Sequence, residues 1–411
     1  MLQYRHFELA NGLQVYLHED STTPIAAFNL LYNVGSKDED PHKTGFAHLF
    51  EHLMFGGSKH IASYDGALQK VGGENNAFTT PDLTNYYITL PAANLEAAFW
   101  LESDRMLSLS FDPEVLEVQR KVVIEEFKQR YLNQPYGDIW LKMRNLAYQV
   151  HPYQWATIGK DISHIEKATM EDVKSFFYKF YTPNNAFLVV AGNVSLERVR
   201  YLAEKWFGDI PAGAPYKREL PKEPAQLQAR REIVKAEVPL KAIYKTYHME
   251  GRNAETYYAT DLLSDVLGRG KASRLYAQLV KELKIFNDIS AFVLGSVEPG
   301  LMVIGGKINQ ETSIEEAEEA IEKAIAPILE ARVPQDELTK VKNQAESSLL
   351  MGSVEILNRA MDLAYFAMLG KPEAINQQSE MIQAVEPQQI FDAAQRVLRA
   401  ENCSTLIYDN E

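Results

Sequence analysis

The chain repeats itself, and this repeat constrains the fold more than any other feature of its 411 residues. Residues 170–193, MEDVKSFFYKFYTPNNAFLVVAGN, align with residues 387–410, PQQIFDAAQRVLRAENCSTLIYDN. In each copy an amphipathic helix leads through an asparagine turn into an apolar strand. Earlier in the chain, PIAAFNLLYNVG (24–35) aligns with PLKAIYKTYHME (239–250) at nearly the same offset. The sequence therefore predicts two related α/β domains of about 200 residues each.

A linker between the two copies is predicted from composition. Residues 209–226, DIPAGAPYKRELPKEPAQ, carry four prolines and charges of both signs, which is typical of a connecting segment. We therefore predict a first domain over 1–208, a linker over 209–226 and a second domain over 227–411. The same offset places HLFEH (48–52) opposite LSDVL (263–267), so the second copy has leucines where the first has histidines.

Composition indicates a globular protein and argues against nucleic-acid and membrane roles. With 46% hydrophobic residues the chain can bury a large core, whereas a formal net charge of -14 repels phosphate backbones and anionic lipids. No segment approaches the ~18 apolar residues of a membrane span. The first residues lack the apolar run of a signal peptide. We expect a cytoplasmic protein, or a periplasmic one if a leader precedes Met1.

A polar cluster interrupts an apolar helix in GFAHLFEHLMF. His48, Glu51 and His52 occupy positions i, i+3 and i+4, which share one face of a helix. Two imidazoles one turn apart can bind one zinc ion, and the carboxylate beside them would take a proton from water rather than bind the metal. The alternative is a hydrogen-bonded polar stripe without metal. The apolar surroundings favour the metal site.

A catalytic zinc site takes three protein ligands and keeps one position open. The predicted helix VLEVQRKVVIEEFKQR supplies two candidates for the third ligand, Glu125 and Glu126. One face of this helix carries three apolar residues at helical spacing, Val115, Val118 and Val122. Glu126 continues that face, which would direct it to the interior. Glu125 lies about 100° away around the helix and could share part of that face. Two adjacent glutamates on a helix, without other evidence, more often lie on a solvated face.

At these motifs the sequence resembles the inverted-motif zinc peptidases, the family of pitrilysin, insulysin and the mitochondrial processing peptidase, in a short two-domain bacterial form. The resemblance covers essentially the whole chain and rests on GFAHLFEHLMF, GGENNAFTTPDLTNYY and RKVVIEEF in that order. It implies a zinc metalloendopeptidase with one zinc ion per chain, held by His48, His52 and Glu126, with Glu51 as the catalytic base. The implied fold is α+β, an α/β sandwich of two similar domains that each pack helices on a mostly antiparallel sheet.

The resemblance also implies how substrate binds. In the family an extended peptide adds a strand to an exposed sheet edge, which matches Asn76, Ala77 and Phe78 here, and Phe55 would line the pocket beside the metal. Ordinary strand and core packing is an equal alternative for the two phenylalanines. Gln119 stands where relatives usually carry a glutamate that supports the site. Its amide can hydrogen-bond a ligand but adds no charge.

The second domain departs from active relatives. They carry an arginine and, seven residues later, a tyrosine that stabilise the oxyanion; in SRLYAQLVKELKIFND these positions fall on Val280 and Asn287. We therefore expect a dimer, preferably with a paralogous subunit that supplies both groups, although a homodimer stays open. The closed chamber of this dimer would admit peptides or unfolded segments. The alternative function is a non-catalytic scaffold subunit, against which the four retained residues of the first domain argue.

Overall fold

The computed structural model describes residues 1–410 and divides into two compact units. The first unit comprises residues 1–128, 155–220 and 350–377, and the second comprises 129–154, 221–349 and the chain from Gln378 onward. Both units therefore differ from the predicted domains in two segments, 129–154 and 350–377. The predicted boundaries follow the order of the repeat along the chain, whereas the units follow spatial contacts, so the boundaries stay a prediction.

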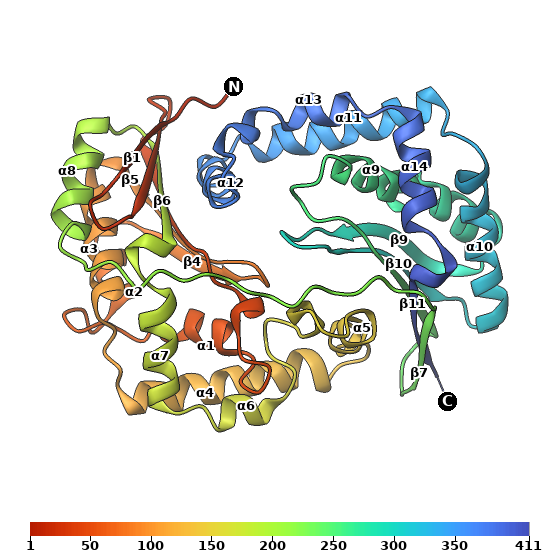
Figure 1. The fold of residues 1–411 in the computed structure, drawn as a ribbon, viewed down its shortest axis with the longest axis horizontal. Coiled ribbons are helices and arrows are strands. Elements are labelled where there is room, and N and C mark those ends of the chain that lie inside the picture. The colour runs from red at the N-terminus through yellow and green to blue at the C-terminus, as the bar shows by residue number, and fades with distance from the viewer. Residues whose placement is uncertain (411) are drawn as a thin grey trace. The chain divides into compact units, whose positions relative to one another are not determined.

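The first unit is built on a six-stranded sheet (Figure 1). The strand order is β1 (Arg5–Glu8), β2 (Gln14–Glu19), β6 (Ala186–Gly192), β3 (Ile25–Tyr32), β5 (Thr84–Pro91) and β4 (Glu74–Thr79). Only β2 and β6 pair in parallel among these strands. The helices of this unit are α1 (Phe46–Leu53), α2 (Tyr64–Gln69), α3 (Leu95–Leu107), α4 (Pro113–Phe127), α6 (Ile162–Glu166), α7 (Met170–Phe180), α8 (Leu196–Phe207) and α12 (Ile356–Met368).

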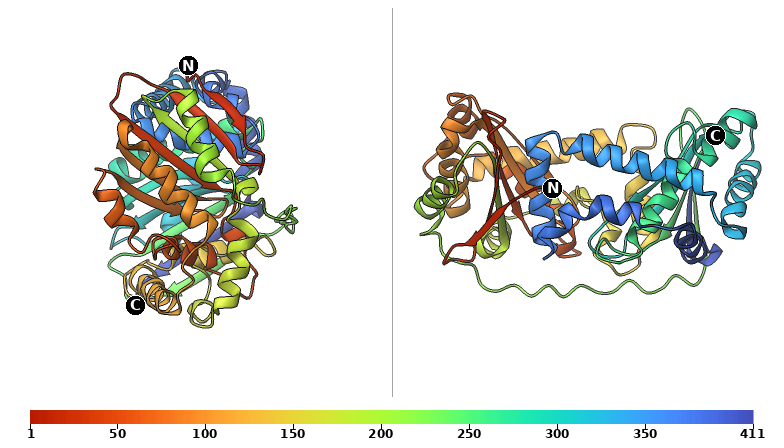
Figure 2. Two further views of the ribbon diagram at one scale, coloured as in Figure 1. Left: turned by 90° about the vertical axis from the view of Figure 1, so that its left-hand side faces the viewer. Right: turned by 90° about the horizontal axis from the view of Figure 1, so that it is seen from above.

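Both faces of this sheet are covered, because β3 alternates apolar side chains between them. Ala27 and Leu31 pack with α12, whereas the ring of Phe28 lies edge-on to Phe99 of α3 at 5.0 Å. Figures 1 and 2 show α3 and α8 on the face opposite α12. The two-sided burial explains why β3 is apolar apart from Asn29, whose side chain bonds to that of Asn85.

The second unit has a five-stranded sheet in the order β7 (Arg230–Lys235), β11 (Cys403–Asp409), β8 (Ala242–His248), β10 (Leu301–Ile308) and β9 (Phe286–Leu294). Only β7 and β11 pair in parallel among these strands. The helices are α5 (Ile139–Ala147), α9 (Tyr257–Gly268), α10 (Ile314–Glu330), α11 (Gln335–Gly352), α13 (Gln378–Gln383) and α14 (Pro387–Val397). Within residues 1–410 none of the helices has both the length and the apolar character needed to cross a membrane.

The internal repeat is confirmed down to the register of the strands. Ala27 of β3 faces Ala191 of β6, and the equivalent positions under the repeat, Ala242 of β8 and Tyr408 of β11, also face each other. Both pairs are antiparallel and lie inside their sheets. The predicted fold class, two similar domains of helices on mostly antiparallel sheets, is therefore confirmed.

The two halves of the sequence exchange one helix. Helix α12 belongs to the C-terminal half, yet its apolar side packs on the first sheet through Ala360, Leu363, Ala364 and Ala367. Helix α5 belongs to the N-terminal half and packs Ile139 and Met143 against Leu406 in the second unit. Repeat alignment alone cannot show such an exchange, since it orders segments along the chain and carries no information on contacts.

The linker is extended but anchored in each unit. Between α8 and β7, residues 208–229 form no helix or strand. In the first unit Arg218 donates to both carboxylate oxygens of Asp38, at 2.7 and 3.0 Å. In the second unit Glu223 accepts N–H bonds from three successive residues, Gln149, Val150 and His151. The predicted linker, 209–226, lies within this irregular stretch, and its charged residues anchor it through these contacts.

Candidate metal centre

Helix α1 carries the HLFEH motif, and a buried carboxylate holds its N-terminus. Glu39 accepts hydrogen bonds from the backbone N–H of Gly45 at 3.0 Å and of Ala47 at 2.8 Å, groups that have no partner within the helix. Trp155 donates to the same carboxylate at 3.0 Å. Gly45 has a φ of +89°, a conformation that favours glycine. Burial raises the pKa of Glu39 to about 8, partly offset by the N–H donors.

A buried arginine holds the other end of the helix. Arg105 is 2% exposed and donates to the backbone carbonyl of Met54, just after α1, at 3.4 Å. Its guanidinium pairs with Glu102 at 2.8 and 2.6 Å and lies 4.4 Å from the ring centre of Tyr86. The cation at the C-terminal end complements the helix dipole, and at the N-terminal end the oxygens of Glu39 accept the first N–H groups. The motif helix is therefore fixed at both ends.

Glutamine at position 39 is expected to destabilise the protein, because the amide group replaces one of two acceptor oxygens by a donor. One of the N–H groups of Gly45 and Ala47 would then lose its partner, at a cost of about 2 kcal/mol. Thermal unfolding should show the midpoint of Glu39→Gln about 5 °C lower. Glu8→Gln, at an exposed position of β1, is the control. Equal midpoints for wild type and Glu39→Gln would contradict this role.

The approach to α1 is also held by a histidine. Nδ1 of His164 accepts the backbone N–H of Thr44 at 3.1 Å and lies 2.9 Å from its hydroxyl oxygen. Accepting this N–H requires a neutral imidazole. Burial lowers the pKa of His164 below 6.5, which is consistent with that requirement.

Acidification is expected to weaken the protein through His164. The unfolded chain binds a proton at higher pH than the folded one, so stability falls as the pH drops from about 6.5 through the lowered pKa. His164→Asn keeps an acceptor oxygen for Thr44 and removes the titration. The loss of melting temperature between pH 7 and pH 5 should be smaller in this variant, with His6→Asn, at an exposed site, as control. An unchanged loss in His164→Asn would refute the prediction.

The structure brings His48, His52 and Glu126 together. Oε2 of Glu126 lies 3.6 Å from Nε2 of His48 and 3.4 Å from Nε2 of His52. The two imidazole rings are perpendicular, with centres 4.8 Å apart, and one ligand atom from each of the three residues lies within 4.8 Å of the others. The three side chains are 14 to 24% exposed. They form a partly buried group of two nitrogens and one oxygen that could hold a metal ion.

The structure separates the two candidate glutamates on α4. Glu126 faces the histidines and its side chain is 17% exposed. Glu125 is 60% exposed and pairs with Lys128 at 2.7 Å. The resemblance therefore selected the residue that the fold brings to the histidines.

The interior face of α4 is not the one predicted from Val115, Val118 and Val122, so that prediction was wrong. Val118 and Val122, which were expected to face the interior, are 56% and 44% exposed. The buried side of α4 carries Leu116, Val123 and Phe127 instead. Glu126 borders that side, which explains how it reaches the histidines. Because the helix has apolar residues on more than one side, periodicity alone does not determine which side is buried.

Glu51 points from the same helix face and has a partner on the sheet. Oγ1 of Thr79, the last residue of β4, donates to Oε2 of Glu51 at 2.5 Å. Both residues are partly buried. Sequence reasoning missed Thr79, Glu39 and Arg105, since each acts through a contact distant in sequence. The only sequence signal for Thr79 was its place in the NNAFTT strand.

The predicted substrate residues lie on β4, the edge strand of the first sheet. The N–H of Thr80 bonds to the carbonyl of Leu83 at 2.9 Å, which sets the ladder so that alternate residues of β4 bond to β5. Asn76 and Phe78 then direct their backbone groups to β5, and Ala77 directs its own to the free edge. In agreement, the N–H of Ala77 bonds at 2.8 Å to the side chain of Asn76. The position of these residues on an edge strand agrees with the prediction. The structure adds that the backbone N–H and C=O groups of Ala77 face the free edge.

The remaining residues singled out from the sequence lie in both units. The ring of Phe55 lies 5.2 Å from the guanidinium carbon of Arg105, and Phe78 is 38% exposed. Gln119 is partly buried two turns before Glu126. In the second unit Val280 packs against the core and Asn287 is exposed on β9. The roles assigned to these residues stay predictions.

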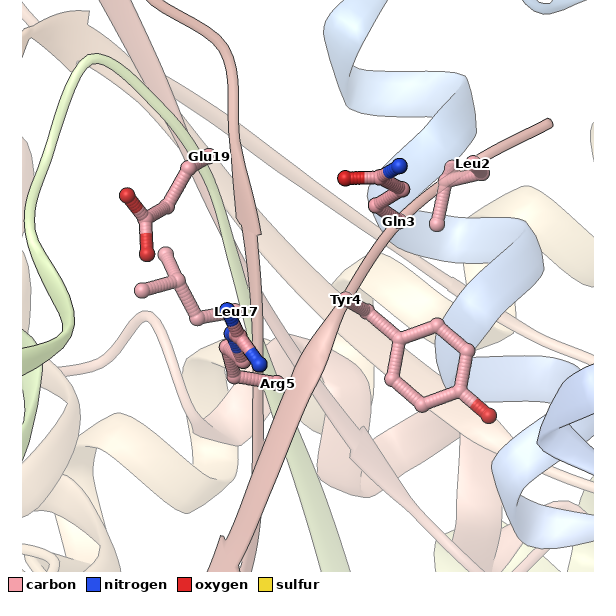
Figure 3. A pocket seen from close by; sticks show the side chains of 6 residues that line it. All are labelled: Leu2, Gln3, Tyr4, Arg5, Leu17 and Glu19. Atoms are coloured by element: carbon pink, nitrogen blue, oxygen red, sulfur yellow. The ribbon is translucent and has the colours of Figure 1, made fainter.

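A separate cavity of about 400 Å³ lies at the opposite edge of the first sheet (Figure 3). It is lined by Leu2, Gln3, Tyr4, Arg5, Leu17 and Glu19, from the chain around β1 and β2. Strands β1 and β4 form the two edges of the six-stranded sheet, so this cavity is not part of the His-Glu cluster.

Comparison with known proteins gives consistent results. Residues 14–157 match the family described as Insulinase (Peptidase family M16), and residues 167–345 match the Peptidase M16 inactive domain. The chain is 32% identical over 350 residues to the zinc protease PqqE of Helicobacter pylori, covering 81% of this chain and 76% of that protein. It is 23% identical to the uncharacterized zinc protease YmxG of Bacillus subtilis over 98% of both chains.

Similarity to solved structures extends over the whole fold. The crystal structure of a protease from Helicobacter pylori superposes with a TM-score of 0.93 at 26% identity, covering 100% of both chains. The segment that matches the inactive domain contains LSDVL on α9, where Leu263 and Leu267 are fully buried. In the second copy, the positions that carry histidines in the first copy are therefore filled by leucines of the hydrophobic core.

Proposed function

This chain belongs to the insulinase family of peptidases, family M16, and we propose that it is the zinc-bearing subunit of an endopeptidase. The observation that carries the proposal is the group formed by His48, His52 and Glu126, with Glu51 on the same helix face. A scaffold subunit would need neither this donor set nor a carboxylate beside it.

The spacing of Glu126 from each histidine fits joint ligation of one zinc ion. Ligand atoms about 2.1 Å from a tetrahedral ion lie about 3.4 Å from one another. Oε2 of Glu126 lies 3.4 and 3.6 Å from the two imidazole nitrogens. When bound, zinc would lower the pKa of a coordinated water and polarise the carbonyl of the substrate.

The residues of the chain supply the remaining chemistry. Glu51 is placed to take a proton from the attacking water and to return it to the leaving amine, as a general base and then a general acid. The fixed ends of α1, at Glu39 and Arg105, hold this carboxylate and the two histidines in one arrangement. Such preorganisation removes the need for the site to rearrange during the reaction.

The free edge of β4 is the proposed substrate site. An extended peptide would pair with the outward N–H and C=O of Ala77, because an edge strand offers unpaired backbone groups. Asn76 now occupies that N–H and would have to release it. Backbone pairing selects extended, unfolded segments and depends little on sequence, which fits peptides or unfolded polypeptides admitted to a closed chamber.

Part of the catalytic machinery is proposed to come from a second subunit. The positions that carry arginine and tyrosine in active relatives are Val280 and Asn287 here, and neither side chain can replace those donors. A second copy of this chain would have the same gap, so a paralogous partner is favoured over a homodimer. The chain alone is then expected to bind zinc but to cleave peptides slowly.

Elemental analysis coupled to a cleavage assay tests the proposal. The chain is purified without chelator, its zinc content is measured, and cleavage of a quenched fluorescent unstructured peptide is followed with and without a paralogous partner. We expect close to one zinc per chain and cleavage that a chelator abolishes. Activity that appears only with the partner would support divided catalysis. No zinc after purification and zinc addition would leave the scaffold alternative.

A further inference from the structure

Thr79 connects the proposed catalytic base to the proposed substrate strand. It is the last residue of β4, and its hydroxyl donates to Oε2 of Glu51 at 2.5 Å. It stands opposite Thr84 of β5, and its neighbours Phe78 and Thr80 direct their backbone groups to β5, so the sheet holds the residue in place. A β-branched side chain on a strand has few χ1 rotamers, which makes the hydroxyl a fixed donor.

A fixed donor constrains the side chain of Glu51, the proposed base. Its backbone is fixed because α1 is held at both ends, but a glutamate side chain still has three rotatable bonds. The bond from Thr79 fixes the position of one carboxylate oxygen and hence the plane of the group. A hydrogen bond from a hydroxyl to a carboxylate is among the stronger ones.

The location of Thr79 links the base to substrate. Thr79 lies two residues after Ala77, so their side chains share one face of the strand. Because Thr80 bonds to Leu83 of the neighbouring strand, both Ala77 and Thr79 direct their backbone groups to the free edge. A peptide paired at Ala77 would therefore lie along the strand that holds Glu51. Any shift of the strand on binding would move the carboxylate with it.

We propose that Thr79 is a positioning residue, which holds Glu51 in the orientation for proton transfer and couples it to the strand that binds substrate. This inference rests on the proposed peptidase function and adds a specific residue to it. The side chain of Thr79 forms no bond with substrate in this role, and a substitution leaves its backbone groups in place. Its loss should therefore lower kcat and leave KM for a peptide unchanged.

The test compares Thr79→Val, which keeps the branched shape and removes the hydroxyl, with Thr79→Ser, which keeps the hydroxyl. We expect kcat to fall about tenfold to a hundredfold in Thr79→Val and to recover to within about threefold in Thr79→Ser. KM and zinc content should equal those of the wild type in both. Thr89→Val on β5 removes a hydroxyl from the neighbouring strand and is the matched control.

A second measurement separates positioning from a general packing effect. In the Glu51→Gln background Thr79→Val should have little further effect on the residual rate, because two residues that act as a unit are not additive. All variants are assayed in the assembly in which the wild type is active. If Thr79→Val does not fold, Thr79→Ala replaces it in both measurements.

The outcomes distinguish this inference from the proposed function. A wild type that cleaves no peptide with or without partner would overturn the proposed function and the inference with it. An active wild type with an equally active Thr79→Val would overturn the inference alone. So would a variant that loses zinc, a rise in KM without a fall in kcat, a serine variant that restores no activity, or additive effects with Glu51→Gln.

Discussion

Glutamine in place of Glu51 is expected to lower peptide cleavage by about a thousandfold, because a general base contributes roughly 10² to 10⁴ to the rate. The amide has nearly the same shape and can still accept the hydrogen bond of Thr79 through its oxygen, but it cannot take a proton at neutral pH. The change removes proton transfer and keeps the structure. Cleavage of the fluorescent peptide, in the assembly in which the wild type is active, measures the loss.

Zinc content decides how that loss is interpreted. His48, His52 and Glu126 remain intact in Glu51→Gln, so close to one zinc per chain should still be bound, as in the wild type. Glu114→Gln, at an exposed position in the first turn of α4, should keep full activity and full zinc content. Zinc lost together with activity in Glu51→Gln would instead make Glu51 a ligand and refute its assignment as the base.

The grouping of His48, Glu51 and His52 could be predicted because these residues lie within five positions of one another in the sequence. The spacing of His48, Glu51 and His52 within one helix determines their common face, whatever the rest of the fold does. The fold class was likewise predictable, since the repeat appears in the pairing of β3 with β6 and of β8 with β11. Both inferences depend only on local geometry or on a comparison of the chain with itself.

The remaining features depend on contacts between distant segments. Glu126 was assigned by resemblance, and the apolar face that seemed to support it is exposed at Val118 and Val122. Thr79 meets Glu51 across 28 positions of the sequence. The exchange of α5 and α12 between the two halves of the sequence left no signal in composition or periodicity. Such features follow from how helices and strands pack, and only the folded structure shows them.

The second unit shows why the same helix can carry a site or a core. At the positions equivalent to His48 and His52, α9 has Leu263 and Leu267, both fully buried. Each would bury an apolar side chain at a gain of about 2 kcal/mol, whereas the histidines of α1 stay partly exposed. The first unit therefore lacks this apolar burial at two positions, where it has partly exposed histidines. The lost stabilisation supports a functional reason for the histidines.

Glu125 and Glu126 of α4 offer the sharpest test of the metal centre, because they are the same residue type at neighbouring positions and only Glu126 faces the histidines. Glu126→Gln is expected to lower zinc affinity at least about a hundredfold, since it removes the charged oxygen 3.4 Å from Nε2 of His52. Glu125→Gln should bind zinc as the wild type does, because Glu125 is 60% exposed and pairs with Lys128. Competition with a chromogenic chelator measures both affinities.

The same pair of variants also tests the assignment by position. Both substitutions remove one negative charge at nearly the same place, so a purely electrostatic effect of the acidic helix on the metal would weaken zinc binding to a similar extent in each. A direct ligand role predicts a large effect at Glu126 alone. A larger effect for Glu125→Gln would mean that α4 turns about its axis by roughly one residue when zinc binds, about 100°, and would refute the ligand set of His48, His52 and Glu126.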